Sequence, residues 1–203
     1  MTTDNPGLVV TETEFRILYP NLFEARAFIK DGKPQGEPKF GLVMLFPPDG
    51  IEDLKAAAKT VAHAKWPGRD LKELSFPFKS GDAQAAKREA AGKDGSFYKG
   101  VVVVKASSKF QPGVADGNKK EILDPKRVYS GAYGYAELNF VAGNGVAGGR
   151  DYVTAYVNHL MVSRKGDRIA TRTAEDVFSG IEGTSTHNDV GVNVSELDDE
   201  IPF

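Results

Sequence analysis

Apolar and polar residues alternate with a period of two along residues 128–162, which is the pattern of β-strands with one buried face. Two runs show this alternation, and the glycine-rich stretch from Val141 to Arg150 separates them. The pattern therefore predicts a β-hairpin. Its apolar face is expected to hold Ala132, Gly134, Ala136, Leu138 and Phe140 from the first strand, and Val153, Ala155, Val157, His159 and Met161 from the second.

The opposite face of this hairpin is polar apart from four tyrosines, Tyr133, Tyr135, Tyr152 and Tyr156. Nucleic-acid bases stack on exposed aromatic rings with about 1–3 kcal/mol per base, largely regardless of which base it is. Tyrosine also has a high strand propensity, and its ring can lie under a helix with only the hydroxyl exposed. This stretch alone leaves both a stacking surface and a structural role open.

Further strands are expected within residues 14–29, 39–46 and 97–106, with a break at Tyr19-Pro20-Asn21 in the first. These strands and the hairpin predict a mainly β protein with helical insertions: an OB-fold, a five-stranded partly open barrel. A β-sandwich also fits the pattern.

Helical periodicity predicts a helix from Ile51 to Trp66, which ends at Pro67-Gly68. A shorter helix is expected from Ala83 to Ala91, capped by Asp82 and closed by Gly92. The second helix is polar enough to lie at the surface.

Charge is distributed unevenly along the 203 residues. Residues 1–172 hold all 26 lysines and arginines and 20 of the 28 acids, a net charge of +6, whereas residues 173–203 hold eight acids and no base. A basic body can attract a polyanion, and an acidic tail can imitate one. We expect an N-terminal arm over residues 1–13, an OB-fold domain over 14–178 and a flexible acidic tail over 179–203.

Composition also excludes some kinds of site. The chain has no cysteine, which excludes disulfides, thiolate metal sites and a cysteine nucleophile. No apolar run is long enough for a membrane helix, and residues 1–6 do not resemble a secretory signal, so the cytoplasm of a bacterial host is the expected location. Since we find no metal-binding, phosphate-binding or nucleophile motif, we expect neither a cofactor nor a metal, and no enzymatic activity.

Basic and aromatic residues alternate in the second half of the body and at one earlier strand. A groove that follows a sugar-phosphate backbone needs cations beside stacking rings, and this sequence supplies both. Besides the four tyrosines, the candidate nucleic-acid-binding residues are Lys39, Phe40, Lys99, Lys105, Lys109, Phe110, Arg127, Tyr129 and Arg150.

The last six residues, Asp198-Asp199-Glu200-Ile201-Pro202-Phe203, resemble the terminal peptide of bacterial single-stranded DNA-binding proteins. Phe203 and its carboxylate can enter a small apolar pocket rimmed by basic residues, while the acids steer the approach. The resemblance implies that these six residues bind replication or recombination proteins.

The body is similar to a bacteriophage family of single-stranded DNA-binding proteins. The resemblance covers roughly residues 15–178 and implies an OB-fold that coats single-stranded DNA during phage replication, recombination or repair. The motifs that carry it, in order, are Asn21-Leu22-Phe23-Glu24, Glu37-Pro38-Lys39-Phe40, Tyr98-Lys99-Gly100, Ala106-Ser107-Ser108-Lys109, Pro112-Gly113-Val114, Ile122-Leu123-Asp124-Pro125, Tyr129-Ser130-Gly131, Asn139-Phe140 and Ala174-Glu175-Asp176-Val177-Phe178.

Together these observations predict a sequence-independent single-stranded DNA-binding protein, with a homo-oligomer left open. Two alternatives are an adaptor that recruits replication enzymes without touching DNA, and an RNA-binding OB-fold protein. The DNA interpretation requires an affinity for oligo(dT) that falls steeply with salt. It also predicts a further loss of affinity when Tyr133 or Tyr135 is replaced by Ala.

Overall fold

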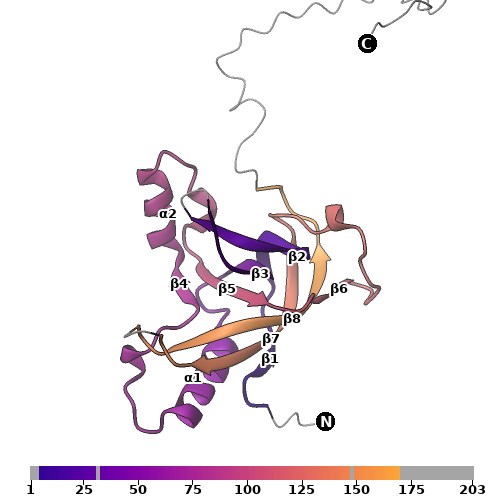
Figure 1. Cartoon of the computed structure of the whole chain (residues 1–203). Coiled ribbons are helices and arrows are strands. Elements are labelled where there is room, and N and C mark those ends of the chain that lie inside the picture. Colours follow the sequence, from indigo (N-terminus) through magenta and orange to yellow (C-terminus); the bar gives the residue numbers. More distant parts are fainter. Residues whose placement is uncertain (1–4, 31–32, 147–148, 170–203) are drawn as a thin grey trace, which may run out of the picture. The chain divides into compact units, whose positions relative to one another are not determined.

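A computed structural model describes residues 5–30, 33–146 and 149–169 (Figure 1). The predicted acidic tail, with the candidate partner-binding residues 198–203, lies outside the described residues. No helix in these ranges is long and apolar enough to cross a membrane.

Five strands close into a barrel, which confirms the predicted OB-fold. Around the barrel the order is β7, β2, β3, β5 and β8, and β8 pairs with β7 again. Neighbours are antiparallel except β5 and β8, which are parallel through Ala106 and Ala155. The bounds are Phe15–Lys30 for β2, Lys33–Phe46 for β3, Val102–Ser108 for β5, Tyr133–Gly143 for β7 and Tyr152–Arg164 for β8.

Three short strands extend this sheet. β1 (Leu8–Val10) pairs with β7, so residues 8–10 of the expected N-terminal arm belong to the sheet. β4 (Phe78–Ser80) pairs with β5, and β6 (Gly113–Asp116) runs parallel to the C-terminal half of β8. β1 and β6 are the two ends of the strand order.

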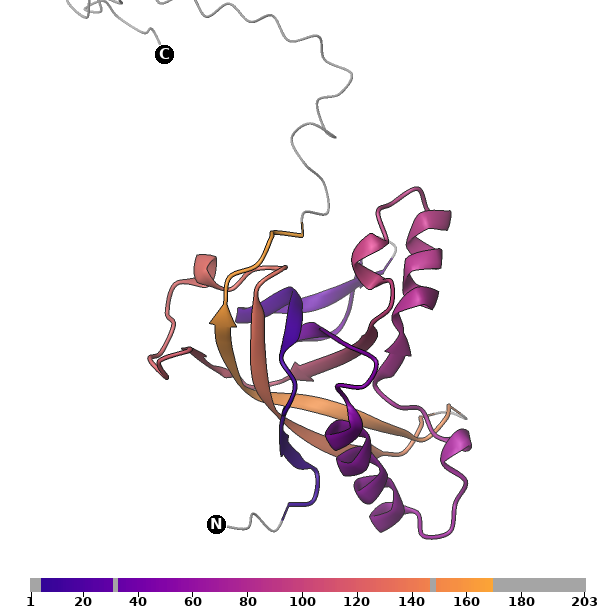
Figure 2. The ribbon, with the colours of Figure 1, turned by 180° about the vertical axis from the view of Figure 1, so that it is seen from behind.

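The two α-helices lie on one side of the barrel, and β6 lies on the opposite side (Figures 1 and 2). α1 (Glu52–Lys65) matches the first predicted helix and buries Leu54, Ala58 and Ala62 in the main core. α2 (Gly81–Ala90) covers the outward-facing Leu18, Leu45 and Val103. Three 3₁₀-helices complete the fold: η1 (Leu71–Glu73), η2 (Ser96–Tyr98) and η3 (Pro125–Arg127).

Several element boundaries differ from the sequence prediction for identifiable reasons. α2 starts two residues early because the hydroxyl of Ser80, not Asp82, accepts the backbone N–H of Ala83. Asp82 instead accepts the N–H of Gly100, at 2.9 Å. Gly92 does follow the helix with a φ of +67°, as expected of a closing glycine.

The strands also differ in length. β3 begins at residue 33 rather than 39, because it forms a long hairpin with β2. The expected break at Tyr19–Asn21 is an irregularity inside one strand, with Tyr19 at a φ of +50°. Residues 96–98 form η2, so β5 starts at Val102 instead of Phe97.

The hairpin of β7 and β8 is present, with a β-bulge that changes its second half. Leu138 pairs with Val157 and Glu137 pairs with His159, which leaves Asn158 without a partner across the ladder. One extra residue turns the following side chains, from His159 to Val162, to the other face, until a second register shift at Ser163. Leu160 is therefore buried, whereas the predicted core position of His159 is wrong: its side chain is 69% exposed and its Nδ1 lies 2.9 Å from Oε2 of Glu137.

Met161 changes sides with His159. It lies on the outer side of the sheet and is half-buried, so its predicted place in the core is also wrong. The first half of the hairpin behaves as expected, because the five apolar-face residues predicted for β7 and its preceding turn are all buried.

Candidate nucleic-acid interface

One outer surface of the barrel gathers cations and rings from β3, β4, β5 and β8. In an OB-fold, the surface of the second and third barrel strands and the loop between the fourth and fifth bind oligonucleotides. These elements are β3, β5 and the β7–β8 loop of this barrel. We call the surface the strand face; its residues are Lys39, Lys79, Lys105, Lys109, Phe110, Arg150, Tyr152 and Tyr156.

Lys105 lies near the middle of the strand face. Its neighbours along β5, Val104 and Ala106, are buried in the core, so alternation turns Lys105 outward, opposite Val43 of β3. Desolvation by the surrounding chain, and then the charge of Lys79, lower the pKa of the Lys105 amine. An anion placed between these two lysines would relieve their mutual repulsion.

Lys109 and Phe110 follow β5 directly. The Lys109 amine lies 2.8 Å from Oε2 of Glu37, and this hydrogen bond raises the pKa of the lysine and lowers that of the carboxyl. Phe110 is 83% exposed, so its ring is available to a ligand. Lys39 lies close enough to Glu37 to lower the same pKa further, which puts two cations around one exposed carboxylate.

Tyr156 and Tyr152 point outward from β8. Both Ala155 and Val157 are buried, which fixes Tyr156 on the outer side, and it is half-buried there. Tyr152 is 39% exposed, at the β7–β8 loop. Arg150 in that loop donates to the carbonyl of Lys72 at 2.8 Å, which anchors the loop to η1.

Other predicted residues lie away from the strand face or are engaged elsewhere. Lys99 forms an ion pair with Glu89 of α2 at 2.8 Å. Phe40 is half-buried, and its neighbour Leu42, on the same side of β3, is in the core. Tyr135 is half-buried and lines an apolar groove with Val10 and Met161.

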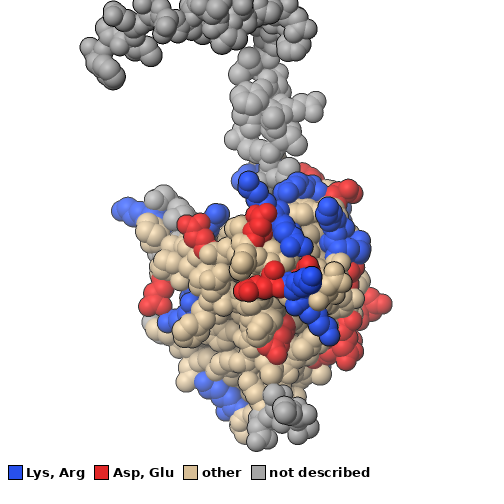
Figure 3. Space-filling model, turned by 90° about the vertical axis from the view of Figure 1, so that its right-hand side faces the viewer, with Lys and Arg blue, Asp and Glu red and all other residues tan. Residues whose placement is uncertain are grey.

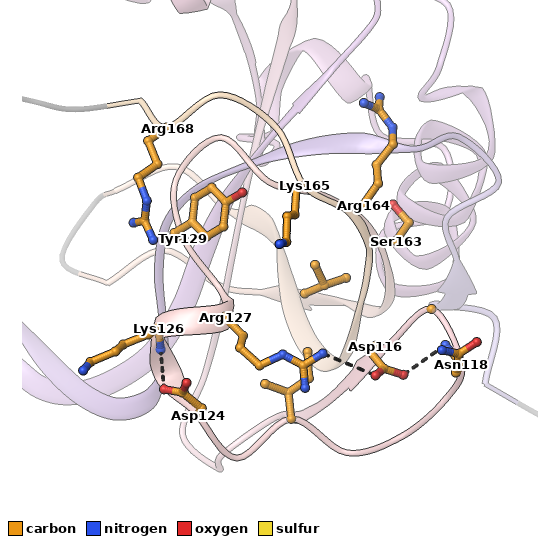
Figure 4. Close-up of a pocket in the computed structure, with 13 residues that line it drawn as sticks. Asp116, Asn118, Asp124, Lys126, Arg127, Tyr129, Ser163, Arg164, Lys165 and Arg168 are labelled. Atoms are coloured by element: carbon orange, nitrogen blue, oxygen red, sulfur yellow. Dashed lines mark hydrogen bonds and ion pairs between the residues drawn. The ribbon is translucent and has the colours of Figure 1, made fainter.

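Arg127 and Tyr129 belong to a second feature, a pocket of about 770 Å³ between η3, the end of β6 and the end of β8 (Figure 4). Arg127 and Tyr129 were selected from the sequence, whereas the other residues of the pocket were not. Figure 3 looks onto this side of the molecule and shows lysine and arginine gathered at its upper end. We call this the basic pocket; its charged residues are Lys126, Arg127, Arg164, Lys165, Arg168, Asp116 and Asp124.

Internal contacts hold several of these groups in place. Arg127 reaches Oδ2 of Asp116 at 3.3 Å. Backbone N–H groups of Lys120 and Asn118 hydrogen-bond that carboxylate and, together with Arg127, keep its pKa low. The Tyr129 hydroxyl donates to the carbonyl of Gly166 at 3.1 Å.

The cations that sequence reasoning missed come from short elements whose position depends on the fold. Lys79 joins the strand face because β4 pairs with β5, and nothing in a three-residue strand signals this. Arg164 ends β8, and Lys165 and Arg168 follow it; none of the three was among the residues selected from the sequence. The sequence signal that could have found them is three cations within five residues, 164–168.

Among the described residues, no group of three or more histidines, aspartates and glutamates could hold a metal ion. The strand face presents cations and aromatic rings, and the carboxylate beside it, Glu37, is paired with Lys109. Its chemistry is that of binding an extended anion with flat bases.

Comparison with known proteins agrees with this chemistry. Residues 8–190 match the family model described as the single-stranded DNA-binding protein of Enterobacter phage Enc34. The chain belongs to this family. A putative protein, p50, of Acyrthosiphon pisum secondary endosymbiont phage 1 is 28% identical over 156 residues, 75% of this chain and 81% of p50.

Two solved structures share the fold. The single-stranded DNA-binding protein of bacteriophage Enc34, in complex with single-stranded DNA, has a TM-score of 0.63 at 16% identity and covers 81% of this chain and 90% of its own. The single-stranded DNA-binding protein gp2.5 of bacteriophage T7 has a TM-score of 0.55 at 9% identity, covering 88% and 96%. The predicted resemblance to phage single-stranded DNA-binding proteins is thereby confirmed.

Proposed function

We propose that this protein coats single-stranded DNA irrespective of sequence during phage DNA replication, recombination or repair, in the cytoplasm of the bacterial host. Membership of a family of single-stranded DNA-binding proteins supports the ligand. The observation that carries the proposal for this chain is the strand face, where exposed cations and rings share the surface that OB-folds use for oligonucleotides.

Phosphates would lie beside the cations of the strand face. Each phosphate contact with a single strand contributes about −0.7 to the slope of log affinity against log salt concentration. The five cations of the strand face would therefore give a slope of roughly −3.5 if each met one phosphate. A phosphate near Lys109 would compete with Glu37 for its amine.

Bases would stack on Phe110, Tyr152 and Tyr156. A ring accepts any base because every base has a flat π-face, so stacking discriminates little between sequences. This is the physical basis of sequence-independent binding. The proposal makes the protein a binding protein rather than an enzyme.

The acidic C-terminal residues would have two roles. Residues 198–203 would recruit replication or recombination proteins through the terminal carboxylate and Phe203, as their resemblance to bacterial tails implies. The eight acids of residues 173–203 would also compete with DNA for the cations of the body, since a tethered anion acts at high effective concentration. Residues 179–203 would then function as a tail attached to an OB-fold domain.

Salt-titrated binding of the full chain to labelled oligo(dT) tests the proposal. We expect measurable affinity in dilute buffer and a steep, linear decline of log affinity with log salt concentration. No binding in dilute buffer would favour the adaptor. Competition between equal lengths of oligo(dT) and oligo(U) tests the RNA alternative, because contacts that tolerate the 2′-hydroxyl would make the two equal competitors.

A further inference from the structure

The basic pocket lies well away from the middle of the strand face. β8 contributes to both: Ala155 pairs with Ala106 of β5 beside Lys105, whereas Ser163 lines the pocket. The eight residue steps from Ala155 to Ser163 span roughly 26 Å at about 3.3 Å per step. A ligand that reaches both surfaces has to be extended along the barrel.

The pocket keeps free positive charge after its internal ion pairs are counted. Lys165 and Arg168 are exposed, and within the described parts of the chain neither forms an ion pair. Figure 4 shows the Lys165 and Arg127 side chains directed into the hollow. Both carboxylates of the pocket are already engaged as acceptors: Asp116 by Arg127 and two backbone N–H groups, and Asp124 by the N–H of Lys126 at 2.9 Å.

The same contacts indicate which part of a nucleotide fits there. Arg168 lies over the Tyr129 ring, with its Cζ 4.1 Å from the ring centroid, so this ring is not free to stack on a base. What remains are ammonium and guanidinium donors in a concave site with a volume typical of small-molecule pockets. Such donors recognise phosphate oxygens.

We propose that the basic pocket is a second contact site for single-stranded DNA, which binds phosphates of the same strand beyond the strand face while the bases point to solvent. This inference rests on the proposed function, because the strand must first lie across the strand face. It extends the occluded length of DNA around the end of β8 without adding any readout of sequence.

Cross-linking from single cysteines tests the position of the strand, because the chain has no cysteine of its own. Asn118→Cys places a photo-reactive label at the pocket without removing a cation, and Thr154→Cys places one on the outer side of β8 near the strand face. We expect both labels to capture the same end-labelled oligo(dT), at nucleotides several positions apart.

The two labels separate this inference from the proposed function. Capture by the label at 154 with none at 118 would overturn the second site and leave the strand face intact. Capture by neither label would overturn both proposals.

Charge removal tests the energetics with a matched control. Lys165→Gln/Arg168→Gln removes two cations of the pocket, and Lys87→Gln/Lys93→Gln removes two exposed lysines on and after α2. We expect only the pocket variant to bind a long oligo(dT) more weakly, with a salt slope shallower by about 1.4 for two lost contacts. The shortest oligo(dT) that the label at 154 captures should bind both variants equally.

Three outcomes would overturn the second site. If the pocket variant lost the same affinity for the short and the long oligo(dT), its two cations would belong to the strand face. If the control variant lost as much affinity as the pocket variant, the effect would be one of net charge alone. Tighter binding by the pocket variant would make the acidic C-terminal residues the occupant of the pocket.

Discussion

The guanidinium of Arg164 lies over the ring of Tyr133, with its Cζ 3.5 Å from the ring centroid. The same guanidinium donates to Oε2 of Glu14 at 2.7 Å, so it is held in place from two sides. The tyrosine therefore has a stacking partner within its own chain, and an outward-facing ring is not necessarily a free one.

This relationship predicts different effects for two tyrosines of the same hairpin. Tyr156→Leu should weaken oligo(dT) binding by about 1–3 kcal/mol, because a stacking platform is lost. Tyr133→Leu should leave the affinity nearly unchanged, in contrast to the expectation from sequence, since Arg164 occupies its ring. Fluorescence anisotropy at fixed salt measures both, and circular dichroism checks that each variant is folded. The opposite order of effects would place the DNA on the Tyr133 side.

Lys105 predicts a dependence of DNA binding on pH. Its pKa is lowered from the ordinary 10.5, chiefly by desolvation and then by Lys79, so it loses its charge at a lower pH than a typical lysine. A nearby phosphate favours the charged form of Lys105 and raises this pKa. At a pH where the free amine is partly neutral, binding of DNA is therefore accompanied by uptake of a proton. Affinity should therefore decline between neutral pH and about pH 10.

Lys105→Arg is the matched control, because arginine stays charged over this range. Its affinity should decline less steeply with pH than that of the natural chain, and calorimetry in buffers of different ionisation enthalpy should show less proton uptake. Identical pH profiles would mean that Lys105 does not meet a phosphate.

The hairpin shows how far alternation carries a prediction from sequence. Five predicted core positions up to Phe140 are buried, because period two holds along an unbroken strand. The prediction was wrong for His159 and Met161, because a β-bulge inserts one residue and nothing in the identity of Asn158 announces it. Pairing with β7, a tertiary property, decides which residue bulges.

The candidate site was less predictable than the fold, and ion pairing is the reason. Sequence shows that Lys99 and Lys105 are basic, but the fold places Glu89 beside the first and Lys79 beside the second. The same positive charge is thus neutralised in one place and reinforced in the other. Which rings are free likewise depends on cross-strand neighbours: Arg164 lies opposite Tyr133 only because of the register in which β8 pairs with β7.

The bulge itself gives a prediction for stability. Deleting Asn158 would remove the bulge and leave a regular ladder in which Val157 and Leu160 both still face inward. Deleting Tyr156 would instead turn Val157, now 1% accessible, to the outer side. Losing the burial of one such valine costs about 1.5–3 kcal/mol. We expect a clear fall in the urea midpoint for the Tyr156 deletion and a small change for the Asn158 deletion. Equal falls for the two deletions would argue against the register.

Glu14 predicts a pH dependence of stability. Although desolvation opposes it, hydrogen bonds from Arg164 and Ser163 lower the pKa of this carboxyl below 4.5. A carboxyl with a lowered pKa stabilises the folded state above its unfolded-state pKa, and this contribution is lost as pH falls through the folded-state pKa. Glu14→Gln should therefore lower the melting temperature at neutral pH, and the difference should shrink below about pH 4. A difference that persists unchanged in acid would contradict the charged hydrogen bonds.

The acidic C-terminus gives the last prediction. Deleting residues 196–203 removes four of the eight acids that follow residue 172, so fewer tethered anions compete with DNA for the body's cations. The truncated chain should bind oligo(dT) more tightly, most clearly at low salt where electrostatic competition is strongest, and should no longer recruit replication proteins. Asp198→Asn/Asp199→Asn/Glu200→Gln separates the two roles, because it removes three charges but keeps Phe203 and the terminal carboxylate. Unchanged affinity of both variants in dilute buffer would exclude competition between these acids and DNA.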